Sequence, residues 1–293
     1  MKIIRHLLEY CIVSCFIVIM RFLGMDFASN LCGKLGRVLG PLLPITNIAR
    51  NNIKRAFPDM LEHDVKHITT KMWDNLSRTV AELPNISNLK NENFYSRVTI
   101  IGQENLEKVR NSGKSCIIIT GHFANWELVP KIVCDAGLKF SFIYREANNK
   151  LVDTQITKLR QNANLIQIPK GKKGARNIIK AFRDNRCVGI LADQKLNTGI
   201  EVPFYGFKAM TASAPAKLAL DYNCPIIPLQ VIRKKGATFT IIIHDPIHIN
   251  HDQNNSAEIY RIMREINYIY EQWIKKYPEQ WFWLHKRWPK NYY

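Results

Sequence analysis

The chain has 293 residues, of which 46% are hydrophobic and 10% aromatic, so it can bury a sizeable core and is not an intrinsically disordered chain. It carries 42 lysine and arginine residues against 24 aspartate and glutamate residues, a formal net charge of +18. Positive charge in this excess favours anionic partners: nucleic acid, an anionic membrane surface or an acidic carrier protein. The seven cysteines form no CxxC pair and no zinc-finger spacing. We therefore expect reduced thiols in a cytosol-facing protein, without disulfides or structural zinc.

The amino-terminal segment is apolar over residues 7–23, apart from Glu9, Ser14 and Arg21. Its uninterrupted apolar core is shorter than the roughly 20 residues of a comfortable transmembrane helix. A signal peptide is disfavoured because no good cleavage site is present after it, and a buried core helix is the alternative. We expect an uncleaved membrane anchor over residues 1–27 that spans the bilayer or dips into one leaflet. More basic residues come after the anchor than before it, which predicts that the rest of the chain lies on the cytoplasmic side.

A helical, membrane-proximal region is expected over residues 28–97. Its helices are predicted from apolar periodicity and from the prolines that come after them, over residues 28–43, 46–57 and 61–83. No Gly/Ser-rich linker separates this region from residues 98–293, so residues 28–293 are expected to form one structural unit.

Strands and helices alternate from residue 98 to the end of the chain. The predicted strands are Val98–Ile101, Cys116–Thr120, Phe140–Tyr144, Leu165–Ile168, Val188–Ala192, Ile226–Ile232 and Thr238–His244. The predicted helices are Trp126–Ala136, Leu151–Asn162, Lys173–Arg183, Ala212–Tyr222 and Ser256–Lys276. This alternation is typical of an α/β domain with a mostly parallel sheet flanked by helices, here residues 98–293.

The main candidate for chemistry lies at the carboxyl end of the second predicted strand. The apolar run in SCIIITGHFANWE ends at Gly121, His122 comes directly after it, and Glu127 lies five positions further on. Ligands gather at the carboxyl ends of parallel strands, and a histidine held by a carboxylate can act as a general base. We expect Glu127 to accept a hydrogen bond from one imidazole nitrogen and to leave the other free for a substrate hydroxyl. A purely structural histidine is the alternative, because this spacing also arises by chance.

Other strand ends and segments add to this site or compete with it. Arg145 and Asp193 come directly after two further predicted strands, so a cation and a second carboxylate are expected at the same edge of the sheet. The basic turn at residues 170–174 precedes a helix and is either a phosphate site or a solvated loop. The aromatic, basic segment PEQWFWLHKRWP at residues 278–289 is core, an interfacial aromatic belt or a stacking platform for nucleic acid.

Together these segments resemble a known family, the late acyltransferases of lipid A biosynthesis of the lauroyl and myristoyl type. The HxxxxD/E box is shared with the wider lysophospholipid and glycerolipid acyltransferases, whereas the carboxyl-terminal segment is more specific. The matching segments are GHFANWE (121–127), YREANN (144–149), Arg160, ADQ (192–194), VPFYG (202–206), APAKLA (214–219), PIIPLQVIR (225–233) and PEQWFWLHKRW (278–288).

The resemblance implies an enzyme of the bacterial inner membrane with its catalytic domain on the cytoplasmic side. It implies transfer of a fatty acyl chain from acyl carrier protein to a hydroxyl of a Kdo-bearing lipid A precursor. The anionic membrane is an implied partner, whereas nucleic acid, a metal and a cofactor are not. A net charge of +18 suits this set of anionic partners.

The resemblance also assigns roles to residues. It implies that His122 is the general base, that Glu127 orients it, and that Arg160 binds the developing oxyanion or a substrate anion. It implies that Asp193 helps to shape the site. The further candidates for binding the substrate or the oxyanion are Arg145, Tyr144 and Asn125.

Two other functions fit the same residues. One is an acyltransferase with another acceptor, such as a lysophospholipid or a different glycolipid. The other is a basic membrane- or nucleic-acid-binding protein in which His122 is structural. Acyl transfer from a thioester needs a base and an oxyanion site but no nucleophile from the enzyme, which agrees with the absence of a GxSxG motif.

Overall fold

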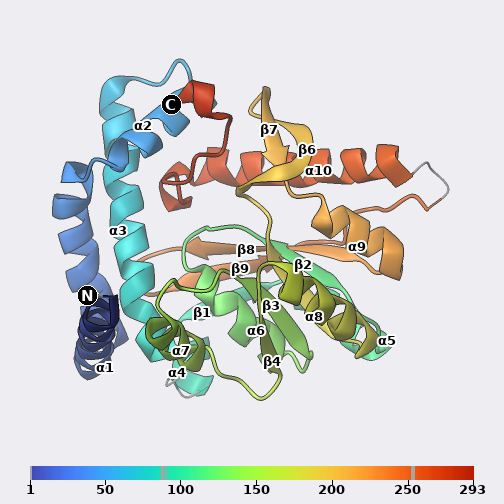
Figure 1. Cartoon of the computed structure of the whole chain (residues 1–293), viewed down its shortest axis with the longest axis horizontal. Helices are drawn as coiled ribbons and strands as arrows, with labels where there is room; N and C mark the ends of the chain where they lie inside the picture. Colours follow the sequence, from blue (N-terminus) through green and yellow to red (C-terminus); the bar gives the residue numbers. More distant parts are fainter. Residues whose placement is uncertain (1, 87–88, 90, 252–254) are drawn as a thin grey trace.

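A seven-stranded sheet forms the centre of the computed structural model, which describes residues 2–86, 89, 91–251 and 255–293 (Figure 1). The strands β8 and β9 are antiparallel to each other, and all other neighbours in this sheet are parallel. In their order across the sheet, the strands are β1 (Val98–Ile101), β9 (Phe239–Ile243), β8 (Ile226–Arg233), β2 (Ile117–Thr120), β5 (Cys187–Leu191), β3 (Phe140–Tyr144) and β4 (Leu165–Pro169).

The predicted fold class, an α/β fold with a mostly parallel sheet flanked by helices, is confirmed. Each of the predicted strands lies within one residue of an observed strand at both ends. The sheet is recognisable from sequence because its central strands are buried on both faces and therefore read as continuous apolar runs.

Helices cover both faces of the sheet. Along β2, Ile117 and Ile119 point to one hydrophobic cluster, and Ile118 points to another on the opposite face. This alternation results from the two-residue repeat of a strand. The face under Ile118 packs on α5 (Gln103–Ser112) and α6 (Val129–Asp135), and the other face packs on α8 (Lys172–Arg183), α9 (Ala214–Tyr222) and α10 (Asn255–Lys276).

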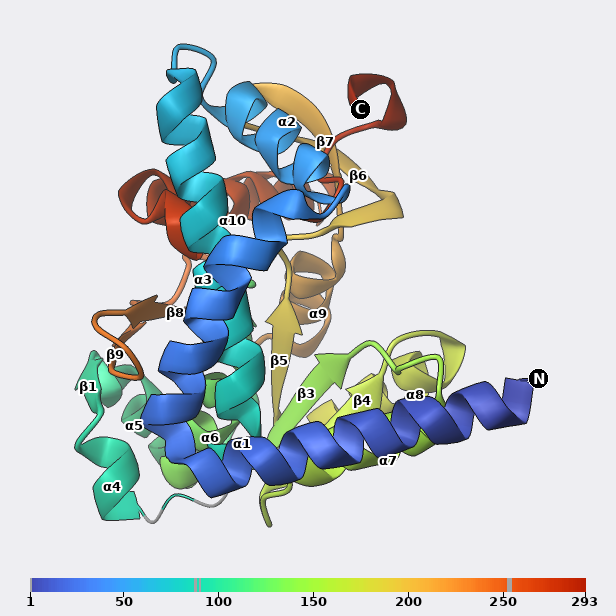
Figure 2. The ribbon, with the colours of Figure 1, turned by 90° about the vertical axis from the view of Figure 1, so that its left-hand side faces the viewer.

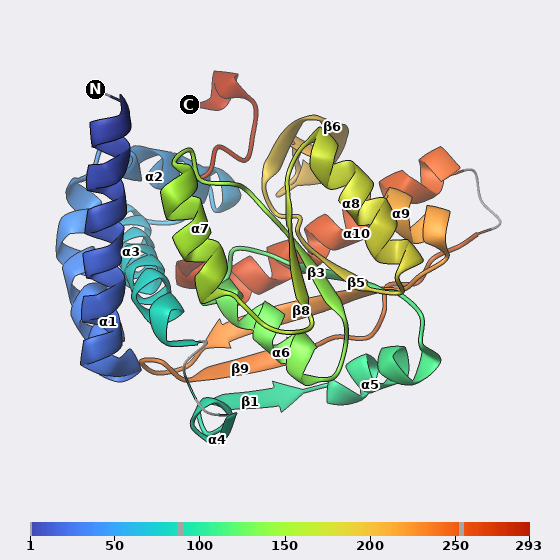
Figure 3. The same ribbon diagram turned by 60° about the horizontal axis from the view of Figure 1, so that its bottom comes forward.

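The amino-terminal helix α1 (Lys2–Leu39) is bent at Gly24, which has non-helical dihedrals (φ 72°, ψ 164°). The part before the bend lies beside α7 (Lys150–Leu159), and the part after it packs along α3 (Glu62–Ile86) (Figure 2 and Figure 3). One helix therefore runs through the expected boundary at residue 27. The remaining helices of this region are η1 (Gly40–Leu42), α2 (Thr46–Ala56) and α4 (Asn91–Tyr95).

Helix α1 is long and apolar enough to cross a membrane, by length and composition. Its side chains leave a broad apolar surface, and the exposed members include Ile3, Ile4, Leu7, Leu8, Ile12, Val18, Ile19, Phe22, Leu35, Val38 and Leu39. Polar contacts tie its first part to the rest of the chain, because the Asn149 amide donates to the carbonyl of His6 and to the Glu9 carboxylate, both at 2.9 Å. The membrane anchor remains a prediction.

In the carboxyl-terminal half, one hairpin was not predicted, and one of the three interpretations of the aromatic segment is confirmed. A hairpin of β6 (Lys195–Phe204) and β7 (Phe207–Thr211) lies over α10, and its sequence lacks a strict apolar alternation. The aromatic segment between η3 (Pro278–Gln280) and η4 (Lys290–Tyr292) belongs to the core, which decides between its three interpretations. Its buried side chains are Trp281, Trp283, Leu284, Arg287 and Trp288.

Candidate active site

The register of the sheet brings His122 and Asp193 together. β2 and β5 are adjacent and parallel, with Thr120 opposite Leu191, so the residues two positions beyond the strand ends face each other. The Nδ1 atom of His122 lies 2.8 Å from Oδ1 of Asp193, and the backbone N–H of His122 donates to Oδ2 at 2.8 Å. The structure thus confirms that these two side chains meet at the carboxyl edge of the sheet.

The Asp193 carboxylate is buried and is hydrogen-bonded to both His122 and Trp281. Its side chain is 1% exposed, and the indole N–H of Trp281 also donates to Oδ2, at 2.8 Å. Burial raises the pKa of Asp193, but the charge and hydrogen bonds of His122 and the bond from Trp281 outweigh it and hold the pKa at about 2. The carboxylate is therefore ionised at neutral pH and accepts the proton on Nδ1.

The second nitrogen of His122 points away from this carboxylate. With Nδ1–H donating to Asp193, Nε2 carries the lone pair, and the Gln194 amide nitrogen lies 3.3 Å from it. The imidazole is 17% exposed and packs against the rings of Trp126 and Phe282, whose centroids lie 5.1 and 5.9 Å away and which also contact each other at 6.5 Å. Nε2 is therefore directed away from Asp193 while the ring plane is fixed.

The loop that carries His122 is tightly packed. A Cβ atom at Gly121 would lie 2.8 Å from the ring of Phe123 and 3.3 Å from the carboxyl carbon of Asp193, so only glycine fits there. The loop pairs with the carboxyl-terminal segment: Phe282 donates its backbone N–H to the carbonyl of His122 at 3.0 Å. The core position of the aromatic segment thus serves the site directly.

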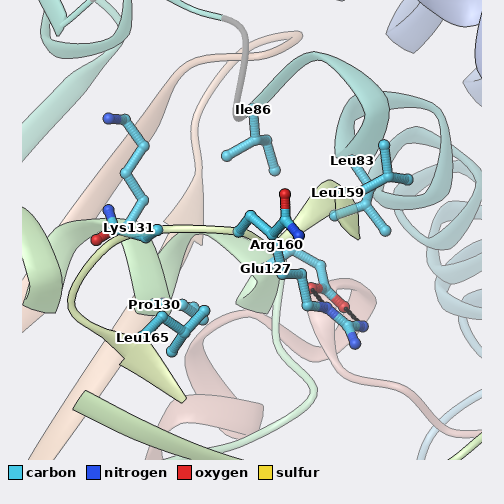
Figure 4. Close-up of a pocket in the computed structure, with 10 residues that line it drawn as sticks. Leu83, Ile86, Glu127, Pro130, Lys131, Leu159, Arg160 and Leu165 are labelled. Carbon is cyan, nitrogen blue, oxygen red and sulfur yellow. Dashed lines mark hydrogen bonds and ion pairs between the residues drawn. The ribbon is translucent and has the colours of Figure 1, made fainter. Parts of the chain in front are cut away.

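Glu127 does not contact the imidazole, which corrects the predicted dyad. It accepts two hydrogen bonds from Arg160, from Nε at 2.6 Å and from Nη2 at 2.7 Å (Figure 4). A third comes from the Trp126 indole at 3.1 Å. The short turn after residue 125 aims the carboxylate at α7 and away from Asp193. Asp193 occupies the position that Glu127 was expected to fill, because its own strand is adjacent to the strand of His122.

Arg160 is held as one half of a bidentate ion pair. Burial lowers its pKa, but the Glu127 carboxylate outweighs burial and raises the pKa, so the guanidinium stays charged. The Asn162 side chain closes the next turn of the chain, accepting the backbone N–H of Asn164 at 2.9 Å.

A cavity of about 70 Å³ adjoins the ion pair (Figure 4). It is large enough for a few water molecules or one small polar group. Apolar and cationic side chains both line it, among them Leu83, Ile86, Lys131, Leu159 and Leu165.

The three remaining candidates for binding the substrate or the oxyanion have no contact with His122 or Asp193 among the described contacts. Asn125 is fully buried, so it supports the loop and does not reach a substrate. The Tyr144 hydroxyl donates to Asp153 at 3.2 Å, and burial together with the charge of Asp153 raises the pKa of this tyrosine to about 12. The Arg145 side chain is exposed and has no ion pair or hydrogen bond within the described part of the chain.

Two residues at the site were not singled out from the sequence. Trp281 fixes Asp193, and His285 accepts the backbone N–H of Lys195 at 3.1 Å. Burial lowers the pKa of His285 to about 4, with His122 adding to this effect and Asp193 opposing it. Both lie in the aromatic segment, whose mixture of indoles and a histidine was the signal available in the sequence.

These contacts define the class of the protein. A histidine with one nitrogen on a buried carboxylate and a lone pair on the other is equipped to take a proton from a hydroxyl or from water. Among the described residues, no cluster of three or more His, Cys, Asp or Glu side chains is arranged to hold a metal ion. The site is that of an α/β enzyme with a histidine–carboxylate pair at the carboxyl edge of its sheet.

Comparison with known proteins identifies the family. The profile for bacterial lipid A biosynthesis acyltransferases matches residues 2–290. A lipid A biosynthesis acyltransferase of Haemophilus influenzae is 28% identical, covering 82% of this chain and 76% of the relative. A lipid A biosynthesis lauroyltransferase of Escherichia coli is 22% identical, covering 82% and 78%. A phosphatidylinositol mannoside acyltransferase of Mycobacterium tuberculosis is 24% identical over 52% of this chain and 49% of the relative.

The chain belongs to the bacterial lipid A biosynthesis acyltransferase family, as the resemblance in its motifs predicted. It is an acyltransferase that transfers acyl groups to acceptors of the lipid A type.

Proposed function

We propose that this enzyme transfers a fatty acyl chain from acyl carrier protein to a hydroxyl of a Kdo-bearing lipid A precursor, with His122 as the general base. The observation that carries the proposal is the orientation of His122: Asp193 holds Nδ1, and Nε2, which lies 3.3 Å from the Gln194 amide nitrogen, is left with the lone pair. The family match supports an acceptor of the lipid A type. The donor fits the net charge of +18, because carrier proteins are acidic.

The proposed reaction has two steps that share one proton. Nε2 of His122 takes the proton of the acceptor hydroxyl while its oxygen forms a bond to the thioester carbonyl carbon, which leaves a tetrahedral oxyanion. Collapse of this intermediate breaks the carbon–sulfur bond, and the protonated imidazole returns the proton to the departing sulfur. Asp193 stabilises the imidazolium between the two steps.

Arg160 is proposed to support the anionic species. Its Nε and Nη2 are bound to Glu127, which leaves Nη1 without a partner among the described residues. This N–H group is free to donate to the oxyanion or to a phosphate of the acceptor. Glu127 then acts by fixing the guanidinium plane, and not by orienting the imidazole.

We also propose that the enzyme works at the cytoplasmic face of the bacterial inner membrane. The exposed apolar side chains of α1 and the positive net charge both favour an anionic bilayer. The contacts of Asn149 with the first part of α1 favour a helix that lies along the body of the protein. A helix that left α7 to cross the bilayer would lose these hydrogen bonds.

A donor and acceptor panel tests the proposal. Purified enzyme is given lauroyl or myristoyl carrier protein and, separately, a Kdo-bearing lipid A precursor, a lysophospholipid or a phosphatidylinositol mannoside, and products are identified by mass spectrometry. The mannoside is included because of the mycobacterial relative. We expect an acylated lipid A precursor. Product from the lysophospholipid or the mannoside alone would show that the acceptor is that lipid and not a lipid A precursor. The absence of product with any carrier-protein donor would contradict the proposal that acyl carrier protein is the donor.

A further inference from the structure

Helix α3 presents a buried polar face to the loop that carries the site. Asn75, Thr79 and Glu82 recur at helical spacing, and their exposed fractions are 6%, 2% and 0%. Polar groups in such a place are costly unless each finds a partner. We call these three residues the α3 polar face. Its partners lie in the loop that runs from His122 to Glu127, on β8 and, through Ser29 Oγ on Glu82 Oε1 at 2.7 Å, on α1.

The first partner is a strained backbone position. Ala124 has a φ of 45°, a left-handed conformation that is unfavourable for a residue with a Cβ atom. Its carbonyl accepts hydrogen bonds from Thr79 Oγ1 at 2.7 Å and from Asn75 Nδ2 at 3.2 Å. Its N–H donates to the carbonyl of Gln280 at 2.8 Å. Strain of this kind persists only where the surroundings determine it fully, and here α3 supplies two of the three bonds.

The second partner is the Asn125 side chain, one residue further on. Its amide nitrogen donates to Oε2 of Glu82 at 2.6 Å, and its Oδ1 accepts the backbone N–H of Glu127 at 3.1 Å. An ionised carboxylate can only accept, so it forces the amide nitrogen to face Glu82. The amide oxygen then has to face Glu127, and the turn that aims Glu127 at Arg160 is closed.

Arg233 on β8 holds the face in place. It donates to both carboxylate oxygens of Glu82, and to the side-chain oxygens of Asn75 at 2.8 Å and of Thr79 at 3.2 Å. Arg233 is 8% exposed. Well-packed apolar residues often give as much stability as a buried ion pair of this kind. The pair is therefore better explained by the geometry that it imposes than by stability.

We propose that the α3 polar face, clamped by Arg233, is the positioning element for acyl transfer. It sets the loop so that His122 lies at one end on Asp193 and Glu127 lies at the other end on Arg160. These residues act through the loop, since Asn75, Thr79 and Glu82 are buried behind it. The inference rests on the proposed function, because one of its tests measures the rate of acyl transfer. A second test measures how well the loop backbone is protected from hydrogen exchange, and this does not depend on the reaction.

A matched pair of threonines on α3 tests the proposal with little risk to folding. Thr79→Val removes the hydroxyl that holds Ala124. Thr69→Val removes an equally buried hydroxyl on the same helix that bonds only within α3, to the carbonyl of Val65. We expect kcat to fall about tenfold in Thr79→Val and to stay within about twofold in Thr69→Val, because small displacements near reacting groups reduce rate steeply.

A charge relocation tests the role of Glu82. Glu82→Gln and Asn125→Asp each disturb the pairing at this point, and each is expected to lower kcat about 100-fold. The double variant Glu82→Gln/Asn125→Asp keeps the net charge of the network and reverses the hydrogen bond, because the new amide donates to the new carboxylate. The amide oxygen keeps the bond from Arg233 Nη1, and Arg233 Nη2 keeps Thr79 as its acceptor, so recovery is expected to be partial. We expect it to recover at least about tenfold of the lost rate, which loss of stability alone would not produce.

Hydrogen–deuterium exchange of the peptide over residues 121–128 is measured for every variant. Faster exchange is expected in Thr79→Val and in both single charge variants, and near wild-type exchange in Thr69→Val and in the double variant. Wild-type kcat and wild-type loop protection in Thr79→Val and Glu82→Gln would overturn the proposal, as would an equal loss in Thr69→Val. If the wild type transfers no acyl group, the proposed function fails, while the exchange pattern still decides whether α3 positions the loop.

Discussion

Substituting Asp193 by asparagine is the perturbation that discriminates most sharply between the observed and the expected partner of His122. Oδ2 of Asp193 accepts from two N–H groups, whereas Oδ1 faces Nδ1 alone. In Asp193→Asn the oxygen of the amide is expected to stay with the two donors, because an NH₂ group there would face two N–H groups. The NH₂ group then faces Nδ1, which has to become an acceptor, and the proton moves to Nε2.

A proton on Nε2 removes the base. General base catalysis contributes about 10²–10⁴-fold, so we expect kcat of Asp193→Asn to fall by about 10²–10³-fold, or about 2.7–4 kcal/mol. The assay is the initial rate of transfer from acyl carrier protein to a lipid A precursor, with both substrates saturating. The matched control is Glu127→Gln, which disturbs the pair with Arg160 and leaves the imidazole contacts intact.

The control is expected to lose about tenfold less activity than Asp193→Asn, since it affects only the orientation of Arg160. Circular dichroism has to show that both variants fold, because an unsatisfied buried polar group costs about 1–3 kcal/mol. Nearly full activity in Asp193→Asn with a loss of about 10³-fold in Glu127→Gln would refute the assignment of Asp193 as the orienting residue.

Three further predictions concern neighbouring residues. Arg160→Lys keeps the charge but loses the bidentate contact with Glu127, so we expect kcat/KM to fall about 10–100-fold. Trp281→Phe removes one donor to Asp193 and is expected to lower kcat about tenfold while the variant stays folded. His285 has a pKa of about 4 when folded, below its ordinary value of 6.5, so its neutral form favours folding and stability falls as the pH drops from 6.5 to 4. The slope for this group is at most about 1.4 kcal/mol per pH unit, and His285→Gln should remove it from urea unfolding curves.

Each of these has a clear negative outcome. Unchanged kcat/KM in Arg160→Lys would mean that the bidentate geometry has no role in turnover. A Trp281→Phe enzyme with wild-type kcat would show that two donors suffice for Asp193. Parallel unfolding curves for wild type and His285→Gln between pH 4 and 6.5 would show that His285 titrates alike in the folded and unfolded chain.

The sheet was predictable from sequence, and the pairing within the site was not. β2 and β5 are buried on both faces and read as apolar runs, so the strand ends that carry His122 and Asp193 could be placed. Strand order is a property of the tertiary fold, and it puts β5 next to β2. Glu127 is close to His122 in sequence, but the intervening turn directs it elsewhere. Spacing along the chain therefore selected the wrong carboxylate.

The residues that support the site, Glu82, Arg233 and Trp281, could not be predicted from the sequence for a related reason. Glu82 and Arg233 are 151 positions apart and meet only because α3 crosses the end of β8. A polar residue on an amphipathic helix is normally exposed, so nothing in the helical pattern marks Glu82 as buried. The aromatic segment that carries Trp281 was visible as a cluster, but its burial results from the packing of α10 and the β6–β7 hairpin.

The central claim is that His122 removes the proton from the acceptor hydroxyl. Its most direct test is the single-turnover rate of acyl transfer from acyl carrier protein to a Kdo-bearing lipid A precursor, with wild type and His122→Ala compared at saturating enzyme. We predict that His122→Ala, folded and still able to bind the acceptor, is slower by about 10²–10⁴-fold. A rate within about threefold of wild type would contradict the claim, because general base catalysis contributes at least about 10²-fold.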